Sequence, residues 1–203
     1  QDMEVPFDRY TATLEDVSRV RLYGQMRRME WDFRLRKNFD GYESKYNSRF
    51  KYMGAMSSCL NNVVYDITNK TKIIDAGCGD SPDCEIALHM GAQRAVGLDL
   101  LPCEKDKKEF IQTDIVEKWP FREGSFDIVL SQAVIDLIDP VSRISFYSEA
   151  YRALRKGGIF AILMQKLSQG WGFHRDTEIQ KIENAGFRNK KHIWGGIQFS
   201  FVK

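Results

Sequence analysis

The sequence predicts a single α/β domain in which helices flank a mostly parallel sheet of seven strands. Five short apolar runs of strand length follow one another between residues 73 and 163, turn signals or helical patterns separate them, and the chain ends on two alternating segments. Continuous apolar runs suit strands that are buried on both faces, as in a parallel sheet covered by helices. With 203 residues the chain is long enough for one such core and too short for two ordinary domains.

Residues 1–69 predict a helical extension that caps the sheet as part of the same domain. Apolar residues recur at intervals of three or four from Leu14 to Phe33 and again from Phe50 to Ile67, and the second helix is expected to end near Asn69. Residues 17–51 hold ten Lys and Arg against four Asp and Glu. This local positive charge suits an anionic partner such as RNA, and it equally suits a solvated helix face.

Residues 70–203 are expected to form the sheet and the functional core. Asp139 is expected to cap a helix over 140–156 that Gly157 and Gly158 terminate, and a second helix is expected over 177–185. The strands are expected at 73–76, 95–98, 110–112, 126–130, 159–163, 187–193 and 197–202.

Composition excludes several classes of protein. No apolar stretch approaches the roughly 18–20 residues that cross a bilayer, so neither a membrane span nor a membrane partner is expected. The chain begins at Gln1 without a signal segment, which favours a cytoplasmic protein, although an upstream targeting segment could have been removed. The chain has four cysteines, at Cys59, Cys78, Cys84 and Cys103. They lack the paired spacing of a zinc site, which favours reduced thiols and no bound metal.

The segment 73–81 is the most informative part of the sequence. An apolar strand ends in Asp75 and continues into a turn with Gly77 and Gly79, and glycine lacks the Cβ that would keep a ligand away from the backbone. The next apolar run ends in Asp99, where a carboxylate can accept hydrogen bonds from both hydroxyls of a nucleoside ribose. A third run is followed by Asp114. The pattern therefore predicts a nucleoside-containing cofactor.

Taken in order, these motifs resemble the class I methyltransferases that depend on S-adenosylmethionine (SAM), a Rossmann-like family. The resemblance covers about residues 70–203 and includes Asp-x-Gly-x-Gly, the Gly-x-Asp strand end, Asp-Ile before Trp-Pro-Phe, Phe-Asp-Ile-Val-Leu and Arg-x-Leu-x-x-Gly-Gly. An NAD-binding Rossmann domain is the competing interpretation, but those domains usually carry a third glycine where this chain has Ser81.

The resemblance implies which residues contact SAM. A further contact follows from charge, since Arg49 could pair with the carboxylate of the cofactor. The cofactor residues implied are Asp75, Gly77 and Gly79 at the methionine end, Asp99 at the ribose, Leu100 beside the adenine, Asp114 and the following Ile115 at its amino group, and Ser131 and Gln132 beside the sulfonium.

The acceptor of the methyl group is not identified by the sequence. The Asn/Asp-Pro-Pro-Tyr/Phe motif of amino-group DNA methyltransferases is missing after Leu130, and Gln132 and Leu163 replace two catalytic residues of the RNA ribose methyltransferases that the chain partly resembles. His174 and Asp136 are the candidate acid–base residues, because both follow strand ends. A small-molecule acceptor is favoured; an RNA or protein methyltransferase and a SAM-binding subunit without turnover stay open.

Overall fold

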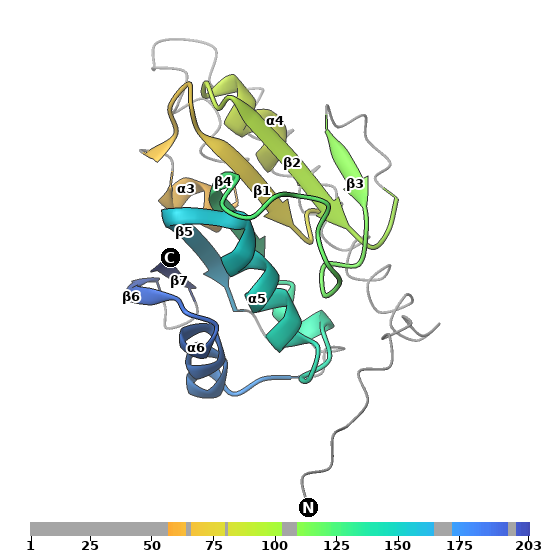
Figure 1. Ribbon diagram of the computed structural model, residues 1–203, viewed down its shortest axis with the longest axis vertical. Helices are drawn as coiled ribbons and strands as arrows, with labels where there is room; N and C mark the ends of the chain where they lie inside the picture. Colours follow the sequence, from red (N-terminus) through yellow and green to blue (C-terminus); the bar gives the residue numbers. More distant parts are fainter. Residues whose placement is uncertain (1–56, 64–65, 80, 103–108, 165–171, 195–197) are drawn as a thin grey trace, which may run out of the picture.

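The computed structural model describes residues 57–63, 66–79, 81–102, 109–164, 172–194 and 198–203 (Figure 1). Most of the predicted helical extension over residues 1–69, including Arg49, lies outside this part, as do Cys103 and residues 165–171. The elements in chain order are α3 (Ser58–Asn62), β1 (Lys72–Ala76), α4 (Asp83–His89), β2 (Arg94–Asp99), β3 (Phe110–Gln112), β4 (Phe126–Gln132), the 3₁₀ turn η2 (Ile135–Leu137), α5 (Arg143–Ala153), β5 (Leu154–Leu163), α6 (Arg175–Asn184), β6 (Arg188–Trp194) and β7 (Gln198–Val202).

The described strands form one sheet of seven in the order β3-β2-β1-β4-β5-β7-β6. Strands β1 to β5 pair in parallel, whereas β7 runs antiparallel to both β5 and β6. The predicted mostly parallel, seven-stranded sheet is therefore confirmed. The strand order reverses between β1 and β4, and open α/β sheets bind ligands beyond the carboxyl ends of the strands at such a point.

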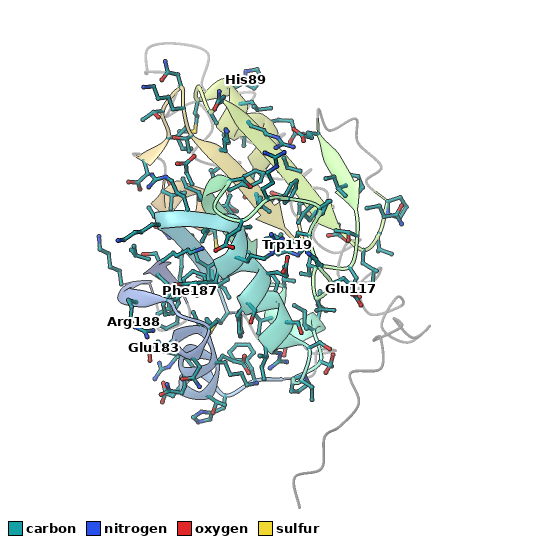
Figure 2. The ribbon with its side chains drawn as sticks, in the orientation of Figure 1. His89, Glu117, Trp119, Glu183, Phe187 and Arg188 are labelled. Atoms are coloured by element: carbon teal, nitrogen blue, oxygen red, sulfur yellow. The ribbon has the colours of Figure 1, made fainter. Side chains whose placement is uncertain are left out.

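The two faces of the sheet bury separate hydrophobic clusters. On one face α5 and α6 cover a cluster rich in aromatic rings, to which Trp119 and Phe187 contribute (Figure 2). In this cluster the rings of Phe160 and Phe187 stack with their centroids 5.1 Å apart. On the other face α3 and α4 contribute Leu60 and Ile86 to a smaller aliphatic cluster. Burial on both faces explains why the central strands read as unbroken apolar runs.

The helix expected over 140–156 is shorter in the structure, where α5 spans Arg143–Ala153. Asp139 does not cap this helix, whose N-cap is Ser142; instead Asp139 Oδ1 accepts hydrogen bonds from the backbone N–H groups of Val141 and Ser142 in the turn before the helix. The helix also does not end at the glycine pair, since Gly157 and Gly158 lie inside β5. A Cβ on Gly158 would lie 2.9 Å from Arg155 O, 2.9 Å from a methyl group of Leu154 and 3.0 Å from Asp127 O on β4, so this glycine permits close backbone approach inside the strand instead of ending a helix.

The helix expected to end near Asn69 also ends earlier, at Asn62. Beyond it the side chain of Thr71 accepts a hydrogen bond from the N–H of Thr68 and donates one to Asp66 O. Threonine side chains that bond to the backbone in this way compete with helical hydrogen bonds and favour turns. The turn leads into β1.

Two expectations from composition can be compared with the described residues. In that part of the chain no helix is long and apolar enough to span a bilayer, and no cluster of His, Cys, Asp and Glu has the arrangement of a metal site. Cys59, Cys78 and Cys84 are buried.

Candidate cofactor site

The turn after β1 has a backbone conformation that requires glycine. Gly77 and Gly79 have φ angles of 75° and 47°, in the left-handed region. The N–H groups of Gly77 and Cys78 both donate to Leu98 O, at 2.8 and 3.0 Å, which fixes the turn against the end of β2. A Cβ on Gly77 would lie 2.5 Å from Cγ2 of Val134, so this position has no room for a side chain.

Asp99, the last residue of β2, faces this turn. Its Oδ2 accepts a hydrogen bond of 2.7 Å from Gly79 N, and its Oδ1 accepts one of 3.0 Å from Leu101 N. The residue is 8% exposed. A Cβ on Gly79 would have no atom of the described residues within 4 Å. Open space at this glycine, whose N–H binds a fixed carboxylate, suits the approach of a nucleoside cofactor with ribose hydroxyl donors, so these residues fit the expected cofactor.

A buried polar cluster lies at the end of β1, where Asp75 and the nearby Asp83 of α4 are 3% and 1% exposed. Asp83 Oδ1 accepts a hydrogen bond of 2.9 Å from Ser57 N at the start of α3. The Cys59 thiol contacts Ser131 O with a sulfur–oxygen distance of 3.5 Å. Burial raises the pKa of this thiol well above its ordinary value, and the charges of Asp83 and Asp75 raise it further, so Cys59 is a protonated donor.

The end of β4 supplies two further polar groups. Ser131 is fully buried, and its Oγ has no hydrogen-bond partner among the described residues. Gln132 Oε1 accepts a hydrogen bond of 3.3 Å from Cys59 N. The next residue, Ala133, has a φ of 56°. Among the described residues it is the one non-glycine residue with a positive φ. Such a conformation costs an alanine about 1–2 kcal/mol, and backbone outliers of this kind concentrate at functional sites.

The remaining predicted cofactor residues lie at the same edge of the sheet. Leu100 follows β2 and is half-buried. Asp114 follows β3, and its Oδ1 accepts a hydrogen bond of 3.1 Å from Val116 N. Ile115 is buried, and its carbonyl accepts a hydrogen bond of 2.9 Å from the indole of Trp119. The sequence therefore located this edge from strand ends alone.

The two candidate acid–base residues differ in environment. Asp136 lies in η2 and is fully buried. His174 precedes α6 and is exposed, and its ring Nδ1 lies 3.5 Å from the hydroxyl of Thr177. His89, at the end of α4, lies toward the edge where β2 begins, away from the carboxyl ends of the strands (Figure 2).

The sequence predicted a helical cap over residues 1–69 but not the contacts through which α3 joins the site. Ser57 and Cys59 contact Asp83 and Gln132 through backbone N–H groups, across separations of 26 and 73 residues. Hydrogen bonds over such separations leave no periodic signal. The one available hint was the acidic first turn of α4, with Asp83 and Glu85.

Residues 74–162 match the sequence profile of a family described as a methyltransferase domain. These residues of the chain form a methyltransferase domain, similar to the class I SAM-dependent methyltransferases that the sequence motifs resemble. SAM is accordingly the cofactor of this domain. The matched segment runs from β1 to β5 and so contains the glycine turn, Asp99 and the end of β4.

Known proteins with different acceptors resemble this methyltransferase domain. The chain is 34% identical to a sterol 24-C-methyltransferase of Pneumocystis carinii over 56% of this chain and 36% of that protein. It is 32% identical to the 18S rRNA (guanine(1575)-N(7))-methyltransferase of Saccharomyces cerevisiae over 43% of this chain and 38% of that protein. A TehB-like SAM-dependent methyltransferase of Corynebacterium glutamicum has the same fold, with a TM-score of 0.58 and 19% identity over 90% of this chain and 98% of that chain. The chain spans half or less of the curated relatives it matches.

Proposed function

We propose that this chain binds SAM at the carboxyl edge of the sheet and transfers its methyl group to a small-molecule acceptor. The observation that carries the proposal is the pair formed by Asp99 and Gly79. The carboxylate is held by two backbone N–H groups, and the space at the glycine is open. A ribose would donate its hydroxyls to this carboxylate.

The other cofactor residues follow from their positions in the sheet. Ser131 and Gln132, at the end of β4, would lie beside the sulfonium, and Asp75 would lie at the methionine end. Asp114 and Ile115 would contact the adenine together with Leu100. Arg49, which lies outside the described residues, would pair with the carboxylate. Bound SAM supplies a methyl group on a positively charged sulfur, which is the electrophile of the reaction.

The protein's own task in methyl transfer is to align the acceptor and exclude water. His174 is the candidate base for a hydroxyl or ammonium acceptor, because it is exposed beyond the end of β5 and an imidazole nitrogen can accept a proton. Asp136 is fully buried, so a bracing role beside the end of β4 suits it better than direct proton exchange with an acceptor. The sterol methyltransferase relative supports a small acceptor.

A second candidate function is methylation of RNA. The relative that acts on 18S rRNA and the ten basic residues within 17–51 favour it. If RNA is the substrate, its affinity should fall steeply with salt, with a logarithmic slope of about −0.7 per contacted phosphate on a single strand. Interspersed acids such as Glu30 and Asp32 dilute the charge, so we rank RNA below a small molecule.

The proposal is tested by incubating the protein with methyl-labelled SAM and three separate pools: metabolites, RNA and proteins. We expect label to appear in the metabolite pool. Label in RNA or protein would identify the second class of acceptor. Tight SAM binding without label in any pool would instead indicate a non-catalytic subunit. The variant H174A should then reduce transfer by about 10²-fold if His174 is the base.

A further inference from the structure

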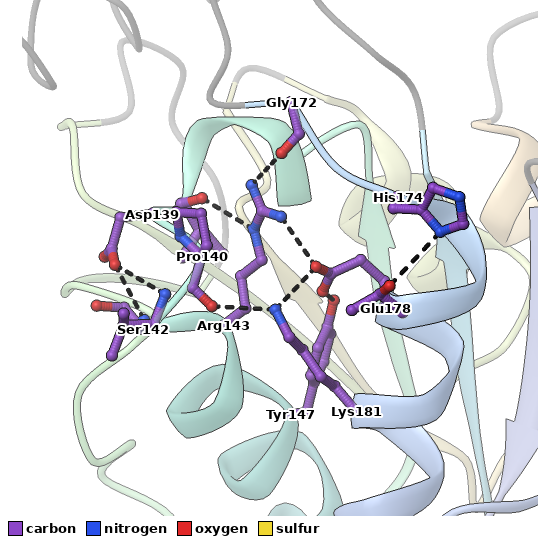
Figure 3. Close-up of polar contacts among 12 residues, drawn as sticks. Asp139, Pro140, Ser142, Arg143, Tyr147, Gly172, His174, Glu178 and Lys181 are labelled. Carbon is purple, nitrogen blue, oxygen red and sulfur yellow. Dashed lines mark hydrogen bonds and ion pairs between the residues drawn. The ribbon is translucent and has the colours of Figure 1, made fainter.

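Arg143, at the start of α5, is a buried cation that donates to three different segments (Figure 3). Its side chain is 1% exposed. Nε donates to Ile138 O at 3.0 Å, one terminal nitrogen donates to Gly172 O at 2.8 Å, and the other donates to Glu178 Oε1 at 3.0 Å. The guanidinium is thus bound to two backbone carbonyls and one carboxylate.

Glu178 on α6 gathers the remaining polar groups of what we call the Arg143 cluster: Arg143, Tyr147, Glu178 and Lys181. Its side chain is 2% exposed and accepts hydrogen bonds from the Tyr147 hydroxyl at 2.8 Å and from Lys181 Nζ at 3.0 Å. Burial and the negative charge of Glu178 raise the pKa of Tyr147 well above its ordinary value, so Tyr147 stays a neutral donor. Lys181 also donates to Pro140 O at 3.1 Å.

The cluster joins the two connections that leave the sheet on the acceptor side. Ile138 and Pro140 belong to the connection from β4 to α5, and Gly172 belongs to the connection from β5 to α6. The backbone N–H of Glu178 also donates to the carbonyl of His174, at 3.1 Å. The candidate base, His174, therefore lies in the chain between Gly172 and Glu178, and Arg143 binds both of these residues (Figure 3).

A gain in folding stability alone does not explain why charged side chains are buried in the Arg143 cluster. Removing two ions from water costs several kcal/mol each, and apolar side chains of similar volume often stabilise a core as well or better. The neighbouring positions already belong to a large apolar cluster that includes Phe146, Phe173 and Ile179. A guanidinium differs from an apolar side chain because its five donors have fixed directions, so it orients the carbonyls that it binds.

We propose that Arg143 and Glu178 are positioning residues that fix the β4–α5 and β5–α6 connections relative to each other, and thereby the place of the acceptor beside the end of β4. The inference rests on the proposed methyl transfer. It assigns acceptor alignment to a cluster that touches neither the glycine turn nor Asp99.

The chain offers a matched control on the same helix. Arg152 donates to Phe121 O at 2.7 Å, to Trp119 O at 3.0 Å and to Glu149 Oε2 at 2.7 Å. It thus has the same partners by type, two carbonyls and one glutamate. Arg152 lies about 14 Å further along α5, next to the start of β5 and the amino edge of the sheet. Its removal should affect stability but not the acceptor side.

The experiment compares R143M with R152M. S-adenosylhomocysteine (SAH) affinity is measured by calorimetry, and backbone hydrogen exchange is measured for peptides covering 138–142 and 172–177. Transfer to the acceptor found with labelled SAM is measured well below both melting temperatures. We expect R143M to accelerate exchange in both peptides and to lower kcat/KM for the acceptor by about 10- to 100-fold. The SAH Kd should stay within about twofold in both variants, and R152M should transfer normally.

Equal losses of transfer in R143M and R152M would overturn the proposal, because the effect would then be general destabilisation. Unchanged exchange in both peptides of R143M would overturn it too, whether or not an acceptor has been found. If R143M does not fold, R143M/E178M replaces it, because that variant leaves no unpaired buried glutamate. Failure of the wild-type protein to transfer label to any pool would refute methyl transfer itself, separately from the exchange result.

Discussion

The glycine turn offers a test in which two neighbouring substitutions have opposite consequences. Gly77 and Gly79 both have positive φ, so alanine at either position costs about 1–2 kcal/mol of backbone strain. A Cβ on Gly77 would additionally lie 2.5 and 2.8 Å from the two methyl groups of Val134, and overpacking of this kind adds about 1–3 kcal/mol. G77A should therefore lower the free energy of unfolding by about 2–5 kcal/mol, and G79A by only about 1–2 kcal/mol.

The affinity for the cofactor product should show the reverse order, with the marked loss in G79A. The new methyl group of G79A occupies space that no described residue approaches within 4 Å, in the turn whose N–H binds Asp99, so SAH affinity measured by calorimetry should fall at least about tenfold while the protein stays folded. Denaturant unfolding measures the stability of both variants. V134A should cost less in the G77A background than in the wild type, because it removes the atoms that the new Cβ meets. Wild-type affinity in G79A, or wild-type stability in G77A, would refute this reasoning.

Two further predictions concern ionisable groups outside the turn. Burial raises the pKa of Glu149, but hydrogen bonds from Arg152 and from Trp119 N outweigh that effect, and its pKa lies below the ordinary value. The stabilisation by this carboxylate should be complete above about pH 4.3 and lost as pH falls through the lowered pKa, so the difference in unfolding free energy between wild type and E149Q should shrink in acid. Cys59 is buried with a raised pKa, so iodoacetamide at pH 8 should label it at least about 100-fold more slowly in native than in unfolded protein, as followed by peptide mass spectrometry. Rapid labelling in the native state would contradict this environment.

The strands could be predicted well because strands that are buried on both faces of a sheet consist mainly of apolar residues. Ile73 and Ile74 on β1 and the run from Ile128 to Leu130 on β4 are apolar on both faces of the sheet, and each is followed by a polar strand end. Helix ends were less predictable. Gly158 has the sequence signal of a helix stop, yet its function depends on the distance to Asp127 O on another strand.

The cofactor side of the site was likewise readable, since Asp75, Gly77, Gly79 and Asp99 lie within two adjacent strand ends. The acceptor side was not. Arg143 and Glu178 are 35 residues apart and look like ordinary charges on two amphipathic helices. Only their burial, with 1% and 2% exposure, distinguishes them from solvated residues. The cytoplasmic location and the assignment of single residues to the cofactor stay predictions.

The central claim is that Asp99 holds the ribose of the cofactor, and titration of SAH into wild type, D99A and D127A tests it most directly. Asp127 is a matched control, because its carboxylate also accepts a backbone hydrogen bond, from Lys72 N at 2.8 Å, but lies at the start of β4 on the opposite edge of the sheet. We expect D99A to weaken SAH binding by about 1.5–3 kcal/mol, or roughly 10- to 150-fold in Kd, and D127A to leave the Kd unchanged. Equal affinity of wild type and a folded D99A protein would contradict the account.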